Sequence, residues 1–170
     1  MFDTFKKLMF ARQINFEEGR ISLLNQPVMI VPVETFVTMT KTLRADLGRT
    51  KADEIIYKAT KLAAIKYLNV LKKSFSMSKV DMIKWAANSL TLAGWGKITI
   101  IGVDGEKNRA DIRVYDSSVA KGLGKDPEPT DIFLAGYFAG GETAVFGKDV
   151  DVKEIKCIAK GDQYCEFVTV

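Results

Sequence analysis

A chain of 170 residues with a net charge of +4 and 47% hydrophobic residues is long enough to bury one core, and a single domain over residues 1–170 is expected. Its 25 basic and 21 acidic residues are interspersed, which gives no electrostatic footprint for nucleic acid, and no apolar run approaches the roughly 20 residues that span a bilayer. The lack of a signal-peptide pattern predicts a cytoplasmic protein, and the absence of histidine excludes Ser-His-Asp and Cys-His catalysis and histidine-ligated haem.

The first half of the sequence predicts a short helix, a strand meander and then three helices. Apolar residues at helical spacing indicate an amphipathic helix within residues 1–12, which packs on the domain or on a partner. Strand-like runs separated by turn residues predict a three-stranded antiparallel meander. The strands are expected over residues 14–17, 20–24 and 28–31, and the helices over residues 32–47, 51–73 and 79–93.

The helix over residues 51–73 carries a strong helical period, with lysines opposite its apolar face. The lysines are best interpreted as a solvated helix face. The side chains expected to be buried are Ile55, Ile56, Ala59, Leu62, Ala63, Tyr67, Val70 and Leu71.

The second half predicts a hairpin, a loop and one very apolar helix. The hairpin strands are expected over 97–103 and 109–115, and residues 116–130 form a connecting loop in which a lone Gly-Leu-Gly is no phosphate-binding fingerprint. Thr130 or Asp131 caps a helix over 132–146 that is apolar on nearly every side and therefore buried. Its glycines, Gly136, Gly140 and Gly141, permit close approach by a neighbouring helix, the sheet or a ligand.

The chain closes on a predicted β-hairpin that holds both cysteines. Strand-like runs over 155–159 and 164–170 flank a turn centred on Gly161, which places Cys157 opposite Cys165. The two thiols are then within reach of one another or of one metal ion. A reducing compartment favours free thiols or metal ligands over a disulfide.

The C-terminal residues are specific enough to indicate a family. The run Gly136-Tyr-Phe-Ala-Gly140, then Phe146-Gly147, and then Glu154-x-x-Cys157-x-x-x-Gly161-Asp162-x-x-Cys165-x-Phe167 resembles the 4-vinyl-reductase-type (hydrocarbon-binding) domain. The likeness covers most of the chain past about residue 15, although only this C-terminal motif is sharp. The resemblance implies an α+β fold, an antiparallel sheet packed with several helices, related to trafficking-complex subunits and haem-nitric-oxide sensors. It also implies a homodimer and an internal pocket for a small hydrophobic molecule.

The resemblance further implies a zinc site. Phenol-responsive members of the family hold zinc through Glu-x-x-Cys-x7-Cys and one further cysteine, and here Glu154, Cys157 and Cys165 match residue by residue. The further cysteine is missing, and Asp131 is the substitute near that place. Because Glu154 and Cys157 are three residues apart, a bulge or bend is needed to bring both to one ion. The alternative is a pair of thiols packed as small apolar groups.

The predicted function is binding or sensing of a small hydrophobic molecule without catalysis. Phenol sensors of the family read their ligand partly through a histidine, so this chain is expected to take a more purely apolar ligand. Two alternatives are an accessory role in tetrapyrrole vinyl-group reduction, for which no dinucleotide, flavin or cluster motif is present, and a ligand-free assembly scaffold. The residues expected to line the pocket are Trp85, Trp95, Phe133, Gly136, Tyr137, Phe138 and Gly140.

Overall fold

The computed structural model describes residues 14–74 and 77–170, in two compact units that meet after Pro32. Each unit is described by itself. The helix expected within residues 1–12 lies outside the described residues.

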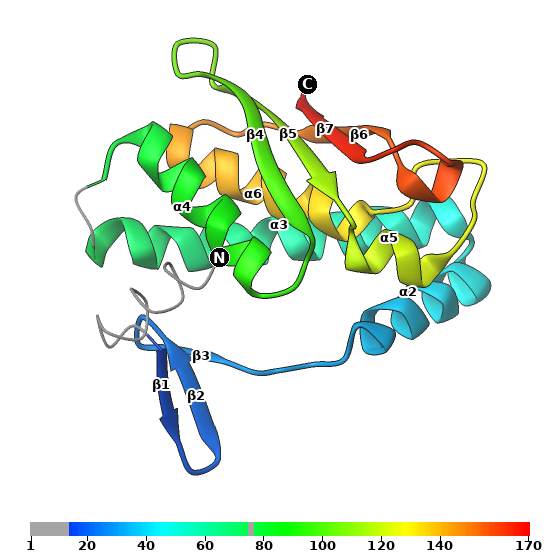
Figure 1. The fold of residues 1–170 in the computed structure, drawn as a ribbon, viewed down its shortest axis with the longest axis horizontal. Helices are drawn as coiled ribbons and strands as arrows, with labels where there is room; N and C mark the ends of the chain where they lie inside the picture. The colour runs from blue at the N-terminus through cyan, green and yellow to red at the C-terminus, as the bar shows by residue number, and fades with distance from the viewer. Residues whose placement is uncertain (1–13, 75–76) are drawn as a thin grey trace. The chain divides into compact units, whose positions relative to one another are not determined.

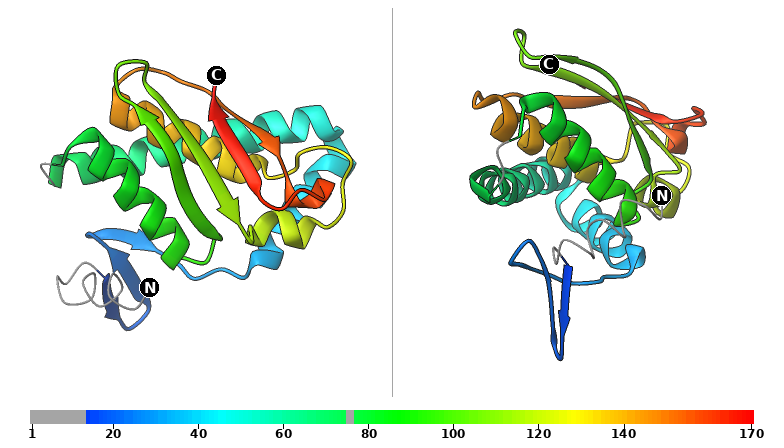
Figure 2. Two further views of the ribbon diagram at one scale, coloured as in Figure 1. Left: turned by 45° about the horizontal axis from the view of Figure 1, so that its top comes forward. Right: turned by 60° about the vertical axis from the view of Figure 1, so that its left-hand side comes forward.

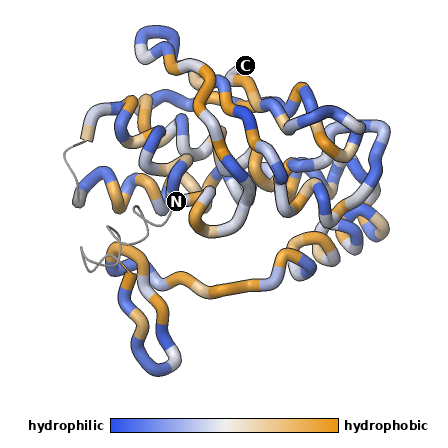
Figure 3. Tube along the Cα trace, viewed as in Figure 1, coloured by the Kyte–Doolittle hydropathy of each residue, from blue (hydrophilic) through white to orange (hydrophobic). Residues whose placement is uncertain are grey.

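The first unit contains the expected antiparallel meander of β1 (Ile14–Glu17), β2 (Arg20–Leu23) and β3 (Gln26–Val28). Its third strand was expected over 28–31, which is wrong, because Leu24 and Asn25 both have positive φ and close a two-residue hairpin loop. The tight loop brings the third strand forward to Gln26. The stretch that follows β3 is apolar (Figure 3), and its Met29 and Ile30 side chains are exposed.

The second unit is an α+β domain, as expected. A four-stranded antiparallel sheet in the order β4-β5-β7-β6 packs against α6, and α6 lies between this sheet and α3 (Figures 1 and 2). The strands are β4 (Lys97–Asp104), β5 (Arg109–Tyr115), β6 (Val152–Lys156) and β7 (Cys165–Thr169). The helices are α2 (Val33–Leu47), α3 (Arg49–Ser74), α4 (Lys79–Leu92), α5 (Ser118–Leu123) and α6 (Ile132–Phe146).

Helix α6 is buried on nearly all sides, as its composition predicts, and its glycines let α3 approach closely. A Cβ placed on Gly136 would meet Thr60 Oγ1 and lie 2.6 Å from the Tyr57 carbonyl oxygen. A Cβ on Gly140 would meet the Lys61 carbonyl oxygen. Of the three candidates for close approach, the neighbouring helix is therefore the one found.

The buried face of α3 differs from the expected one. Ile56 and Leu71 are buried as expected, but Ile55 and Leu62 are 40% and 50% exposed. The helix carries apolar residues on two adjacent stripes, and the one that fits α6 combines small and branched side chains. This buried stripe consists of Ala52, Ile56, Thr60, Ala64, Leu68 and Leu71, whereas Ala59 and Ala63 are exposed together with Ile55 and Leu62.

The segment 116–130 is not entirely loop, because it contains α5. Ser117 caps this helix by accepting from the Ala120 N–H, and Val119 and Ala120 are buried. A Cβ on Gly122 would meet the Val37 side chain, so the glycine that suggested a loop permits α5 to pack on α2. In the described part of the chain, no helix is both long and apolar enough to cross a bilayer.

Candidate functional site

A bulge in β6 brings Glu154 and Cys157 to the same side. Glu154 pairs with Phe167 and Lys156 pairs with Glu166, so Ile155 is the extra residue in the ladder. Both Glu154 and Cys157 are buried as a result. This is the irregularity that a shared ligand site requires.

The hairpin itself differs from the expected one. β6 ends at Lys156, residues Ile158–Lys160 form a short 3-10 helix, and Cys165 pairs with Val114 of β5. The Cys157 N–H donates to the Asp162 carboxylate at 2.8 Å, and this local bond takes the place of a ladder bond. Cys157 and Cys165 are therefore not a cross-strand pair.

The two thiols nevertheless meet. Cys157 Sγ and Cys165 Sγ are 3.8 Å apart, both side chains are fully buried, and the cysteines are free. A disulfide needs an S–S distance of about 2.05 Å, whereas two thiolates on one tetrahedral zinc, with Zn–S bonds of about 2.3 Å, lie about 3.8 Å apart. One carboxylate oxygen of Glu154 completes a set of three donor atoms that lie within 4.8 Å of one another.

The electrostatics of this cluster show an unsatisfied acid. Glu154 Oε2 accepts from the Asp131 backbone N–H at 2.8 Å, but Oε1 is buried without a hydrogen-bond partner. Burial, with the nearby Asp131 and Cys157, raises the pKa of Glu154 to about 9. The hydrogen bond from Cys165, assisted by the Thr130 and Ala159 backbone, lowers the pKa of Cys157 to about 5, and the same bond raises the pKa of Cys165.

Asp131, the expected fourth ligand, serves first as the cap of α6. Its carboxylate accepts from the Ser117 hydroxyl and, at 3.3 Å, from the Leu134 N–H. Burial raises its pKa to about 6. Among the described residues, the group of mutually close donors comprises Glu154, Cys157 and Cys165, and Asp131 adjoins it through its backbone.

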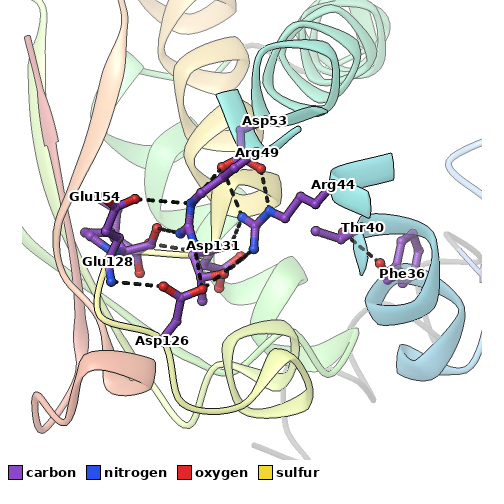
Figure 4. A network of polar contacts seen from close by, with 11 residues as sticks. Phe36, Thr40, Arg44, Arg49, Asp53, Asp126, Glu128, Asp131 and Glu154 are labelled. Atoms are coloured by element: carbon purple, nitrogen blue, oxygen red, sulfur yellow. Dashed lines mark hydrogen bonds and ion pairs between the residues drawn. The ribbon is translucent and has the colours of Figure 1, made fainter. Parts of the chain in front are cut away.

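A charged network holds the segment that leads to Asp131 (Figure 4). Arg44 of α2 donates to the Asp53 carboxylate at 2.7 Å and to Thr130 Oγ1 at 2.8 Å, and Arg49 donates to Asp126 at 2.7 Å. The side chains of Arg44 and Asp53 are only 14% and 20% exposed. No local pattern signals this network, since its partners are up to 86 residues apart and each alone is an ordinary surface charge.

The expected pocket residues fall into separate groups. Trp95, Phe133 and Tyr137 form one aromatic cluster with Phe36, with ring centroids 5.0 to 6.3 Å apart. Phe36 was expected only as core, so its place in this cluster was missed. Of the other expected residues, Gly136 and Gly140 face α3, Phe138 packs on Phe167 of β7, and Trp85 is half-buried on α4.

A surface depression of about 330 Å³ lies at the junction of α2 and α3, away from the aromatic cluster and the thiols. It is lined by Leu47, Gly48, Arg49, Thr50, Lys51 and Glu54.

Two family models match the chain. Residues 9–101 match a domain of unknown function (DUF5943), and residues 110–170 match the 4-vinyl-reductase-type domain. No curated protein gives a significant match.

Three solved structures share the fold. The phenol-responsive sensory domain of the transcription activator PoxR, solved with phenol, is 21% identical with a TM-score of 0.83, over 99% of this chain and 89% of that one. A vinyl-4-reductase family protein from Methanocaldococcus jannaschii is 16% identical with a TM-score of 0.57, over 84% and 83%. A trafficking protein particle complex subunit 3 from Naegleria fowleri, covalently bound to palmitic acid, is 13% identical with a TM-score of 0.55, over 81% and 93%.

Proposed function

The chain belongs to the family of the domain of unknown function DUF5943, its C-terminal part is a 4-vinyl-reductase-type domain, and on this premise we propose that it binds or senses a small hydrophobic molecule without catalysis. The observation that carries the proposal is the likeness to the PoxR sensory domain, which extends over 99% of the chain and whose structure contains phenol. The trafficking subunit that holds palmitic acid is a second similar fold with an apolar guest.

The aromatic cluster of Phe36, Trp95, Phe133 and Tyr137 is the proposed ligand-contact region. Trp95 and Tyr137 are only partly buried, so part of their aromatic surface is available to a guest molecule. These rings offer wide apolar surfaces and a few polar atoms, which suits an aromatic or aliphatic ligand. Trp85, Gly136, Phe138 and Gly140 remain predicted pocket residues.

Zinc at Glu154, Cys157 and Cys165 is the second part of the proposal. The donor set fits this metal, because two thiols stand at the separation that tetrahedral zinc requires and the orphaned Glu154 Oε1 needs a partner. Asp131 or a water molecule would supply the fourth ligand. The ion would be structural, joining β6, the turn after it and β7 next to the cap of α6.

A homodimer and a cytoplasmic location complete the proposal. Within the second unit, α3 exposes an apolar stripe formed by Ile55, Ala59, Leu62 and Ala63, which is suited to covering by a second copy. A ligand-free assembly scaffold is the second candidate, favoured by the likeness to the trafficking subunit. A role beside a vinyl reductase is the third, and the likeness to the Methanocaldococcus protein favours it.

The test is mass spectrometry of the gently purified protein with elemental analysis of zinc. We expect a bound apolar compound and zinc close to one ion per chain. Cys165→Ser should lose the zinc while keeping the apolar compound, and Asp131→Asn separates an aspartate ligand from a water ligand by whether zinc remains. Protein without any extracted compound, and without a thermal shift on adding phenols, fatty acids or alkanes, would contradict the binding function.

A further inference from the structure

A second buried acid, Glu142, lies away from both proposed sites. It projects from α6 against the ends of β5 and β7, and its side chain is only 3% exposed. The residues one turn further along its face of the helix, Val145 and Phe146, belong to an apolar cluster with Met82, Ile83 and Ala110. An acid in such surroundings must either find a positive partner or stay neutral.

Counting protons decides the state of Glu142. Thr169 Oγ1 accepts from the Ala110 N–H at 2.9 Å, and it lies 3.0 Å from the Ala110 carbonyl oxygen and 2.6 Å from Glu142 Oε2. A threonine hydroxyl has one proton, so it cannot donate to the carbonyl and to a carboxylate together. If Glu142 carries a proton, it donates to Thr169, Thr169 donates to Ala110, and every one of these atoms is satisfied.

The other carboxyl oxygen supports the same state. Glu142 Oε1 is buried with no hydrogen-bond partner, and leaving a charged oxygen in that position costs far more than leaving a neutral one. Thr169 also takes the place of a backbone group at the end of the ladder, since both its contacts with Ala110 are to the main chain. The acid, the threonine and the strand end thus form one hydrogen-bonded unit.

The charged groups on the elements packed around α6 are engaged elsewhere. On β5, Asp111 is an acid that disfavours a charge on Glu142, and it is paired with Arg109 at 3.1 Å. The others are Lys72 of α3, which donates to the Ala144 carbonyl oxygen at 3.3 Å, Lys79 of α4, which lies over the Phe146 ring, Asp104 of β4, which pairs with Lys107, Glu166 of β7, which pairs with Arg113, and Glu154 of β6, which lies at the opposite end of α6 beside Asp131.

We infer that Glu142 is a proton-controlled latch: its neutral carboxyl closes α6 onto the ends of β5 and β7, and loss of the proton as the pH rises opens this contact to water. Burial raises the pKa of Glu142 from its ordinary value of 4.5 to about 7, while Thr169 and the Ala110 N–H act in the opposite direction. Because the folded pKa lies above the unfolded one, the stabilisation is complete below about pH 4.5 and is lost as the pH rises to about 7.

The test compares the full chain with Glu142→Gln, whose amide imitates the neutral acid, across about pH 5 to 8.5 by denaturant unfolding. Between about pH 5 and 7, the unfolding equilibrium constant of the original chain should rise by up to about tenfold per pH unit relative to that of the variant. Glu106→Gln, the same change at an exposed position of the β4–β5 turn, should keep the original pH slope. Equal slopes in the original chain and in Glu142→Gln would overturn the latch.

A measurement on the unsubstituted protein keeps the test open if the variant fails to fold. The amide nitrogen shifts of Ala110 and Thr169 should titrate in NMR spectra with a midpoint near pH 7. A midpoint near 4.5, or no titration, shows that Glu142 is charged at neutral pH and overturns the inference.

Discussion

Three carboxylates, Asp131, Glu142 and Glu154, are buried in this domain, and each is satisfied differently. Asp131 caps a helix and Glu142 bonds to a threonine, whereas Glu154 keeps one oxygen without a partner. Sequence reasoning identified Asp131 and Glu154 through the family motif. It missed Glu142, because a single acid in an apolar helix looks like a solvent-facing residue until its neighbours are known.

The sign of the Glu154→Gln effect should depend on zinc. In metal-free protein the acid has a pKa of about 9, above the unfolded value, so its stabilising effect is lost as the pH rises from about 4.5 to about 9. At pH 8 we expect the variant to be more stable than the original metal-free chain by about 2–4 kcal/mol, measured by urea unfolding with a chelator. With zinc present, the variant should bind the metal more weakly and be the less stable of the two. The same sign in both conditions would argue against Glu154 as a ligand.

At the scale of elements, the contact between α3 and α6 organises the second unit. Gly136 and Gly140 are one turn apart and face α3, whereas Gly141 meets only the Leu68 side chain, with 3.3 Å to Cδ1. The helix therefore tolerates its glycines because two of them set the distance between the helices. The third has no such role.

Substitution by alanine should separate these positions. Gly136→Ala and Gly140→Ala place a methyl group against the backbone of α3, and we expect each to lower the free energy of unfolding by at least about 1–3 kcal/mol. Gly141→Ala is the matched control and should be neutral or stabilising by up to about 1 kcal/mol, since alanine favours the helix. Chemical denaturation measures all three, and equal losses at the three sites would contradict this account of the packing.

At the scale of the whole molecule, the chain divides after Pro32. The apolar clusters that form the core draw their residues from Tyr57 onward, and a small isolated meander is marginal in water. We expect residues 33–170, expressed alone, to unfold cooperatively and to retain the helical circular dichroism of that unit. A truncated chain without a cooperative transition would show that the first 32 residues are part of the folding unit.

The sequence by itself determined the local elements: the strand meander, the Ser78 cap of α4, the 97–115 hairpin and the buried helix with its glycines follow from periods, caps and turns within a few residues. It also determined the Glu154, Cys157 and Cys165 set, through a motif contained in a short stretch of chain. Only the tertiary structure decided which stripe of α3 is buried, that α5 forms on α2, that Arg44 reaches Thr130, and that Glu142 meets Thr169. The physical reason is that these features depend on partners distant in the chain, whose burial and hydrogen bonds no local pattern contains.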